Sequence, residues 1–404
     1  MGKSTASQTV YPIKLFHERK GTVMKIDRRT CIFQTNETDE KYARIKDEYK
    51  YESFIYNLLE EIDLDERRYK RLNEELLLIR LSGSFRILYI SYLLTSKIRK
   101  DGRSYCLNCI NNDLLVNYLL GISKVDPFDK QFLYALPYEP VLGIPEGPEK
   151  MFIQIWVSPD YRQTLIDYLF EICKEDRILF HRLNSYNGKT WISEGSYMMI
   201  PKGEDPDRYG DYYDDGTIRG FEEIYKDNSH DMIRISLLES ERMNILDEGS
   251  RFLDDYEPSE AFDLLVDSCL AETNDHFICK DGTPYIYYGM TFWDFCLSVC
   301  KPHNSTRGGL GTTLLGCRED IWKMLERCNL THEERYDLYK TISKHIDAVD
   351  GKTKEIIRQV YPYDCDVICR DIEDLYYIHP ISASIEDVFN ETRIAWIRNR
   401  KESE

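Results

Sequence analysis

The segment EKMFIQIWVSPDYRQ, at positions 149–163, most constrains the fold, because it predicts a β-strand that runs directly into a helix. Both alternating sets of its side chains are suited to burial, so the strand can be covered on both faces. An acidic residue in a strand of this kind is typical of a metal site. Positions 151–158 hold no aspartate or glutamate, so the strand lacks such ligands.

Most of the remaining chain is predicted to be helical. Two amphipathic helices are expected at 65–81 and 84–100, divided by Gly83 and followed by Gly102. A helix at 112–120 closes at Gly121, and another follows the strand at 161–174. The short strands SYMMIP and DMIRISLL flank an acidic tyrosine-rich loop at 205–216, which is typical of a solvated excursion. After Pro258 we expect mainly helices, with a capping box at 331–334.

These patterns predict an α+β fold that is mostly helical and contains a small mixed sheet. We expect three parts along the chain. They are residues 1–64, with short strands and a helix from about Asp47, residues 65–240, which contain the sheet, and residues 241–404, which are helical.

The charge balance argues against general affinity for nucleic acid. The 404-residue chain has 53 basic and 71 acidic side chains and a net charge of −18. Such a field repels nucleic acid at long range, although a local basic groove can still bind it. No apolar run approaches the roughly 18 residues that a membrane helix needs, and the N-terminus lacks an apolar signal core. We therefore expect a cytoplasmic protein with no membrane partner.

The cysteines and phosphate-type motifs give no complete site. Cys106 and Cys109 form a lone CxxC, whereas structural zinc usually needs a second pair, so we expect buried, reduced thiols and no metal. The GK[ST] triplets at 188–190 and 351–353 lack the P-loop glycine five positions earlier, where Leu183 and Ile346 stand. The glycine-rich segment 303–313 can cradle a phosphate, but a flexible connector is the better interpretation.

Taken in order, several segments resemble the polymerase core of the PolC-type bacterial DNA polymerase III alpha-subunit family. The helical pair at 71–102 is similar to the family's entry to the palm, and YCLNCINNDLLVNYLLGISKVDPF follows as its nucleotide-binding loop and helix. The opening strand falls on P-D-I-D-L-N-F, SEGSYMMIP on H-P-G-G-I-I-V-V-P, and MIRISLLE on L-L-K-L-D-I-L-G. The segments FDLLVDSCL, LLGCREDIW and YYIHPISASIEDVFNETRIAW follow the fingers, where Pro380, Arg393, Ile394 and Ala395 keep their places.

The resemblance spans about residues 69–398 and implies a degenerate palm-like domain with a reduced thumb at 65–240. About 35 positions separate Ser158 from Ser193, which is short for the family's thumb. Residues 241–404 would then be a helical fingers-like domain.

The resemblance also implies which functional residues are missing. Family members hold two magnesium ions on three aspartates, and the matching positions here are Phe152, Gln154 and Ser236. Phe152 cannot ligate a metal, and the other two offer only neutral oxygens. The triphosphate loop G-S-R-G-S matches residues 106–110 without its arginine or glycines, and the lysine and histidine of P-K-A-H match Ile381 and Ala383. We therefore expect no catalytic residue and no cofactor.

Three functional hypotheses remain open. The first is a catalytically inactive polymerase relative that acts as a scaffold in replication or on a mobile element, with DNA, a replisome component or another protein as its partner. The second is an active, magnesium-dependent DNA-directed DNA polymerase whose site is rebuilt from the acidic residues at 205–215. The third is an acidic DNA mimic or inhibitor-type interaction protein. A small-molecule substrate is not expected.

If DNA is bound, basic residues beside the former nucleotide loop and in the palm and fingers segments are the candidates. They are Lys97, Arg99, Lys100, Arg103, Arg234, Arg307 and Arg318.

Overall fold

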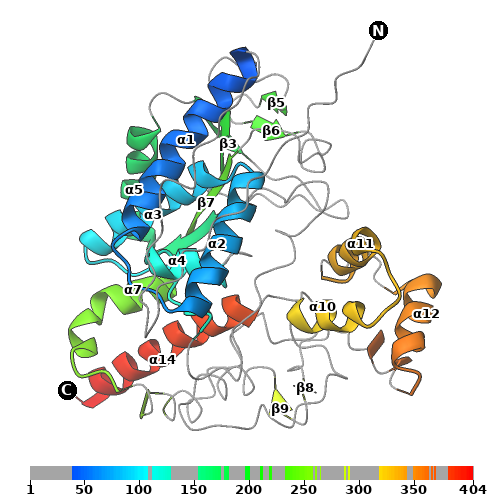
Figure 1. Ribbon diagram of the computed structural model, residues 1–404. Coiled ribbons are helices and arrows are strands. Elements are labelled where there is room, and N and C mark those ends of the chain that lie inside the picture. Colours follow the sequence, from blue (N-terminus) through cyan, green and yellow to red (C-terminus); the bar gives the residue numbers. More distant parts are fainter. Residues whose placement is uncertain are drawn as a thin grey trace.

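The structure is a computed structural model (Figure 1). It describes residues 39–107, 112–128, 153–173, 177–181, 196–200, 210–212, 218–220, 233–257, 260–261, 264, 286–287, 290–291, 318–343, 349–363, 365–366, 368–369 and 381–403.

A mixed seven-stranded sheet is the centre of the described fold, with strand order β1-β2-β7-β4-β3-β6-β5. The pairs β2–β7 and β3–β6 are parallel, and the other neighbours are antiparallel. The strands are β1 Cys106–Leu107, β2 Ile153–Val157, β3 Arg177–His181, β4 Ser196–Ile200, β5 Gly210–Tyr212, β6 Ile218–Gly220 and β7 Ile233–Glu239. A separate ladder joins β8 Ile286–Tyr287 to β9 Met290–Thr291. The sheet and the helices together confirm the α+β class.

The acidic tyrosine-rich segment contributes a strand to this sheet, so the prediction of a loop is wrong for residues 210–212. These residues form β5, which pairs with β6 at one edge of the sheet. The prediction missed β1, β3, β5 and β6, and it also missed β8 and β9, which lie where mainly helices were expected. For β5 the reason is length and composition, because three residues, Gly-Asp-Tyr, are too few to show an alternating apolar pattern.

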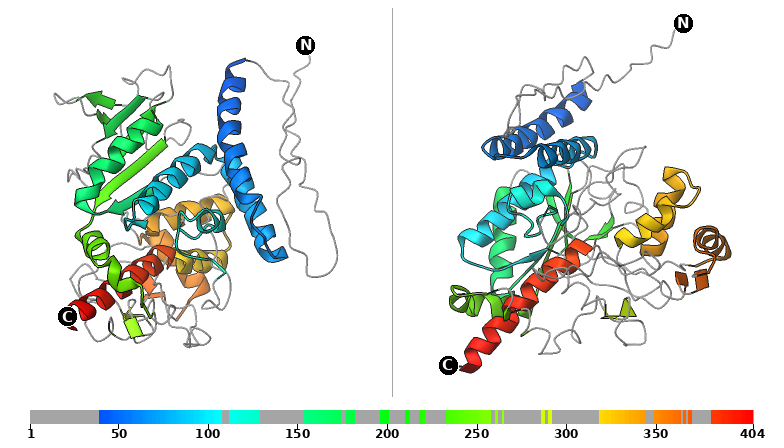
Figure 2. Two further views of the ribbon diagram at one scale, coloured as in Figure 1. Left: turned by 90° about the vertical axis from the view of Figure 1, so that its left-hand side faces the viewer. Right: turned by 60° about the horizontal axis from the view of Figure 1, so that its bottom comes forward.

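One face of β2 is buried and the other is half-buried, which qualifies the expectation of burial on both faces. The buried face continues into β7, and its residues are Ile153, Ile155, Val157, Ile235 and Leu237. It shares a core with α3 (Phe85–Lys100) and α5 (Pro159–Ile172), the helix that follows β2 directly (Figure 2). Gln154 and Trp156 lie on the half-buried face.

Local signals fix the ends of the first helices. The helix α2 (Glu66–Leu81) begins at Asp65, whose side chain accepts a hydrogen bond from the Arg68 N–H. Gly83 has φ 62° between α2 and α3, and Gly102 has φ 69° after α3, where a side chain would be strained. The helix α1 (Asp39–Leu59) starts earlier than the predicted Asp47 and packs on α3. Among the described residues no single helix is long and apolar enough to cross a membrane, and the one pair that passes on length and composition, α2 with α3, is bent by 113°.

A buried carboxylate on α2 holds the start of α4 (Leu115–Leu119). The Glu75 side chain is fully buried and accepts hydrogen bonds from the N–H groups of Leu115 and Val116, each at 2.9 Å. It also pairs with Arg71, four residues earlier on the same helix. These N–H groups have no partner inside their own short helix, so Glu75 satisfies them. Burial raises the pKa of Glu75, and the Arg71 charge and the two N–H groups act in the opposite direction.

The C-terminal helix α14 (Ile381–Ser403) returns to the sheet and packs on β1, α7 (Glu241–Glu248) and the 3-10 turn η4 (Ser250–Leu253) (Figure 2). The indole N–H of Trp396 donates to the carbonyl of Phe252 at 2.7 Å. Ile394 and Ile397 join a small apolar cluster against which Trp156 of β2 packs. The end of the chain is therefore part of the same packed body as its strands.

Three further helices, α10 (Arg318–Glu326), α11 (His332–Ser343) and α12 (Gly351–Val360), pack through α10. The predicted capping box is confirmed before α11. The Thr331 N–H donates to the Glu334 carboxylate at 2.9 Å, and the Glu334 N–H donates to the Thr331 hydroxyl at 3.2 Å.

We expect Glu75→Gln to lower the free energy of unfolding by about 3–5 kcal/mol, because the buried Arg71 loses its counter-charge and an amide cannot accept both N–H groups. Urea unfolding followed by circular dichroism measures this. Glu74→Gln, on the exposed side of the same helix, is the matched control and should change stability by no more than about 0.5 kcal/mol. Equal losses in the two variants would contradict the role given to Glu75.

Candidate functional site

Two of the three positions that match the family's metal aspartates lie side by side in the sheet. Gln154 of β2 and Ser236 of β7 are direct Cα partners in the parallel ladder, about 4.8 Å apart by ordinary strand spacing. Ser196 of β4 is the partner of Ser236 on its other side. Phe152 lies outside the described residues. The fold therefore brings Gln154, Ser236 and Ser196 into one row across three neighbouring strands.

The chemistry of this row does not fit a pair of magnesium ions. Ser236 is 3% exposed and offers a hydroxyl, and Gln154 is half-buried and offers an amide oxygen. Magnesium is held in such sites by carboxylates fixed on rigid elements. No step of metal-assisted phosphoryl transfer can be assigned to these side chains.

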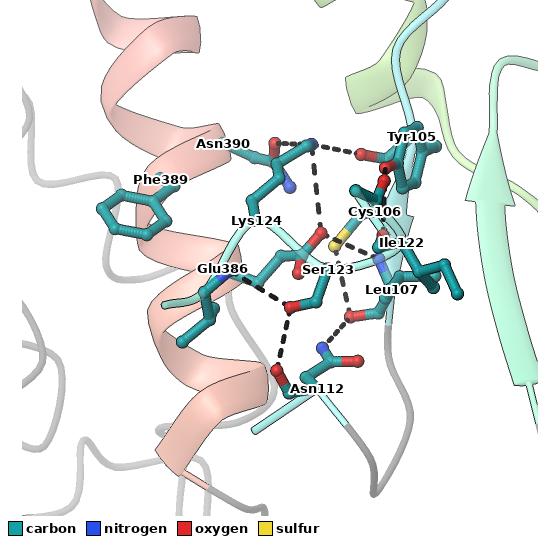
Figure 3. A network of polar contacts seen from close by, with 12 residues as sticks. Tyr105, Cys106, Leu107, Asn112, Ile122, Ser123, Lys124, Glu386, Phe389 and Asn390 are labelled. Carbon is teal, nitrogen blue, oxygen red and sulfur yellow. Dashed lines mark hydrogen bonds and ion pairs between the residues drawn. The ribbon is translucent and has the colours of Figure 1, made fainter. Parts of the chain in front are cut away.

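The segment that the resemblance matches to the family's triphosphate loop is hydrogen-bonded to α14 at its start. The Leu107 N–H in β1 donates to the Glu386 carboxylate at 3.2 Å, across 279 positions of sequence (Figure 3). The Asn112 amide then donates to the Leu107 carbonyl at 2.8 Å, which closes the described part of the loop. Positions 108–111 lie outside the described residues. One N–H of the segment is thus already engaged by a carboxylate of the protein itself.

Lys124 completes this contact from the other side. Its ammonium donates to the Tyr105 carbonyl, and it donates to the Asn390 side-chain oxygen at 3.2 Å (Figure 3). The same ammonium lies 3.9 Å from the Glu386 carboxylate. Glu386 is fully buried, and burial raises its pKa while the Lys124 charge opposes that rise. Sequence reasoning missed Lys124, Glu386 and Asn390, because nothing local signals a contact between residues more than 260 positions apart.

The described cysteines are free, and all of them are buried. Burial raises the pKa of Cys106 well above its usual value, and the negative charge of Glu386 adds to the shift. A thiol in this state is a poor nucleophile and a poor metal ligand at neutral pH. Cys109, the second member of the CxxC, lies outside the described residues.

Four of the basic candidates gather at the end of α3, and two of those are paired with acids. Lys97 pairs with Asp101 at 2.7 Å. Arg103 pairs with Asp160 at 2.9 Å and with Asp247 at 3.2 Å. These contacts reduce the positive charge that this surface offers to DNA.

The other basic candidates differ in placement. Arg99 donates to the Gly121 carbonyl, and Lys100 is exposed. Arg234 lies in β7 and Arg318 begins α10, whereas Arg307 lies outside the described residues. The structure thus groups Lys97, Arg99, Lys100 and Arg103 at the end of α3, whereas Arg234 and Arg318 belong to other elements.

The second GK[ST] triplet forms an ordinary capped helix start. Gly351, Lys352 and Thr353 open α12, and the Asp350 carboxylate accepts the Thr353 N–H at 2.7 Å. This contact lowers the pKa of Asp350. A capping carboxylate occupies the position that a phosphate would need, in agreement with the missing P-loop glycine. The first triplet lies outside the described residues.

No protein-family model matches this chain, and no curated protein gives a match. The resemblance to the polymerase family therefore stays a prediction from the motifs.

We expect Tyr105→Phe to weaken the loss of stability between about pH 10 and pH 12. The Tyr105 hydroxyl donates to the backbone carbonyls at Gly121 and Ile122, and burial, aided by the Glu386 charge, raises the pKa of Tyr105 to about 12. The folded state thus holds this proton more tightly than the unfolded state. The resulting stability is complete below about pH 10 and falls by about 1.4 kcal/mol per pH unit up to about pH 12.

Unfolding free energies measured at several alkaline pH values in the wild type and in the variant test this. Tyr118→Phe, on the adjacent helix α4, is the matched control, because it removes one phenol hydroxyl at another tyrosine. Identical slopes in the wild type and in Tyr105→Phe would show that Tyr105 does not hold its proton in the folded state.

Proposed function

We propose that this chain is a relative of the PolC-type DNA polymerase III alpha subunits that no longer transfers nucleotides and acts as a binding scaffold. The observation that carries the proposal is the direct pairing of Gln154 with Ser236 on adjacent parallel strands. The resemblance requires these two positions to meet, although 82 positions separate them in the sequence. They meet with neutral side chains where the family has carboxylates.

The nucleotide segment supports the same proposal. Its Leu107 N–H is engaged by Glu386, and Cys106 is buried. A phosphate-binding loop instead presents free N–H groups to its ligand. The proposal is supported by the Leu107 N–H, which is already engaged, and by the arginine and glycines that the resemblance would require and the sequence lacks at 106–110.

The sheet order disfavours a polymerase site rebuilt from the acidic loop. Asp211 lies in β5, and three strands stand between β5 and β7, which carries Ser236. Four strand spacings correspond to about 19 Å. Two catalytic metal ions must lie about 3.5–4 Å apart on shared ligands, so Asp211 is too distant to replace an acid beside Gln154.

A protein is the better-supported partner. The net charge of −18 opposes DNA, and Lys97 and Arg103 are paired with acids of the same chain. A scaffold of this charge is suited to a partner with a basic surface. A role in replication or on a mobile element, and a location in the cytoplasm, belong to the same proposal.

We expect the full chain to give no extension of a primer on a template with all four deoxynucleoside triphosphates in magnesium or manganese buffer. Denaturing gel electrophoresis of a labelled primer measures this. Fluorescence anisotropy of the same duplex at physiological salt should show no binding tighter than about 10⁻⁶ M, the range of non-specific association. Template-directed extension would overturn the loss of activity, and tight, saturable duplex binding would overturn the preference for a protein partner.

A second experiment tests the geometry of the strand pair. We expect Gln154→Asp combined with Ser236→Asp to lower the thermal unfolding midpoint in chelator, because two like charges face each other across the ladder. Manganese should then restore part of the loss, since paired carboxylates bind a hard divalent ion. The variant with asparagine at both positions is the neutral control and should not respond to manganese. A carboxylate variant that ignores manganese would argue that the two side chains do not converge.

A further inference from the structure

A pocket of about 600 Å³ lies where the end of α3, the Gly121 turn, α7 and α14 meet. The charged residues that line it, among those that the structure describes, are all basic: Arg99, Arg103, Lys124 and Arg393. No described aspartate or glutamate lines it. Four cations around one hollow are notable in a chain whose net charge is −18.

The local structure directs these cations to the pocket. Gly121 has φ 65°, and a Cβ built there would come within 3.1 Å of the Arg99 guanidinium, so the glycine leaves room for that group. Among the described residues, no carboxylate lies within ion-pair distance of Arg99 or Arg393. Arg393 instead lies 5.9 Å from the ring of Tyr256. Burial lowers the pKa of Lys124, Glu386 and Cys106 oppose that, and the positive charge of Arg393 lowers it further, so these two cations repel each other.

A buried amide adds a second, independent observation. Asn390 is fully buried at the wall of the pocket, and its Oδ1 accepts a hydrogen bond from Lys124. Its Nδ2 donor has no hydrogen-bond partner among the described residues. A buried donor without an acceptor is costly, and such a group in a native protein calls for an explanation, of which a bound ion or ligand is one.

We propose that this pocket binds a small molecule that carries a phosphate group. A phosphate would supply the negative charge that Arg99 and Arg393 do not receive from any described carboxylate, and its oxygens accept hydrogen bonds. Apolar side chains also line the pocket and can hold the remainder of the ligand: Leu119, Leu246 and Leu253. The volume lies within the usual range for small-molecule sites, about 300–1,000 Å³, and is too small for duplex DNA.

The proposal is independent of the loss of polymerase activity. Among the described residues, Gln154, Ser236, Cys106 and Leu107 do not line the pocket, so a failure of either proposal leaves the other standing. It also runs against the expectation that small molecules are not ligands of this chain.

Isothermal titration calorimetry of the full chain tests the proposal with inorganic phosphate, adenosine monophosphate and adenosine as probes. We expect the monophosphate to bind with a Kd below about 1 mM and adenosine to bind about tenfold more weakly, or not at all, because it lacks the anionic group. Inorganic phosphate should compete with the monophosphate. A 5′-phosphorylated single-stranded oligonucleotide serves to distinguish a nucleic-acid end from a free small molecule.

Arg393→Gln and Arg99→Gln should each weaken binding of the monophosphate about tenfold, the loss expected for one charge-assisted contact. Lys100→Gln is the matched control, because Lys100 is an exposed cation at the same end of α3 and does not line the pocket. It should change the affinity by less than about twofold. Thermal unfolding of each variant shows whether it folds. If Arg393→Gln does not fold, the affinity of Arg99→Gln for the monophosphate decides the test.

Three outcomes would overturn the proposal. One is no binding of either phosphate probe up to about 10 mM. Another is an equal loss of affinity in Arg99→Gln and Lys100→Gln, which would indicate a general charge effect. The last is saturable binding of the oligonucleotide with none of the monophosphate, which would assign the basic surface to nucleic acid instead.

Discussion

One buried carboxylate, Glu386, joins the end of the chain to the edge of the sheet, and much of the described structure depends on it. It accepts the Leu107 N–H and lies beside Lys124, while the helix that carries it packs on β1 and α7. A desolvated charge of this kind stabilises only when its partners are in place. The apolar cluster around Trp156 and the pocket wall at Arg393 both require α14 in this position.

Glu75 serves the same region from the opposite side. It accepts the N–H groups at the start of α4, so the segment between β1 and Phe128 is held by one carboxylate from α2 and another from α14. Each carboxylate accepts N–H groups that no strand or helix satisfies. In the segment where the resemblance would place a ligand's phosphates, the Leu107 N–H is paired within the protein. This contact supports the proposal of a binding scaffold.

Net charge alone is a poor guide to what this molecule binds. The chain is strongly acidic, yet the charged groups that line the pocket at the end of α3 are all cations among the described residues. Lys97 and Arg103 resemble DNA-binding residues in the sequence, but the fold pairs both with acids. Arg393 was predicted only as a position that the family shares, and the fold places it at the pocket. Screening limits a long-range field to roughly 10 Å, so local grouping decides which ligand is attracted.

The sequence by itself determined the α+β class, the helices on either side of Gly83, the strand around Gln154 and the Thr331 capping box, because periodicity, glycine and caps act over a few residues. It also determined that Phe152, Gln154 and Ser236 are not carboxylates. The resemblance matches these three positions to the metal-binding aspartates of the polymerase family. Only the tertiary structure decided that Gln154 faces Ser236, that β5 joins the sheet edge, and that Glu386 meets Lys124 and Leu107. These contacts join residues far apart in the chain, and no local preference encodes which of many apolar surfaces will pack together.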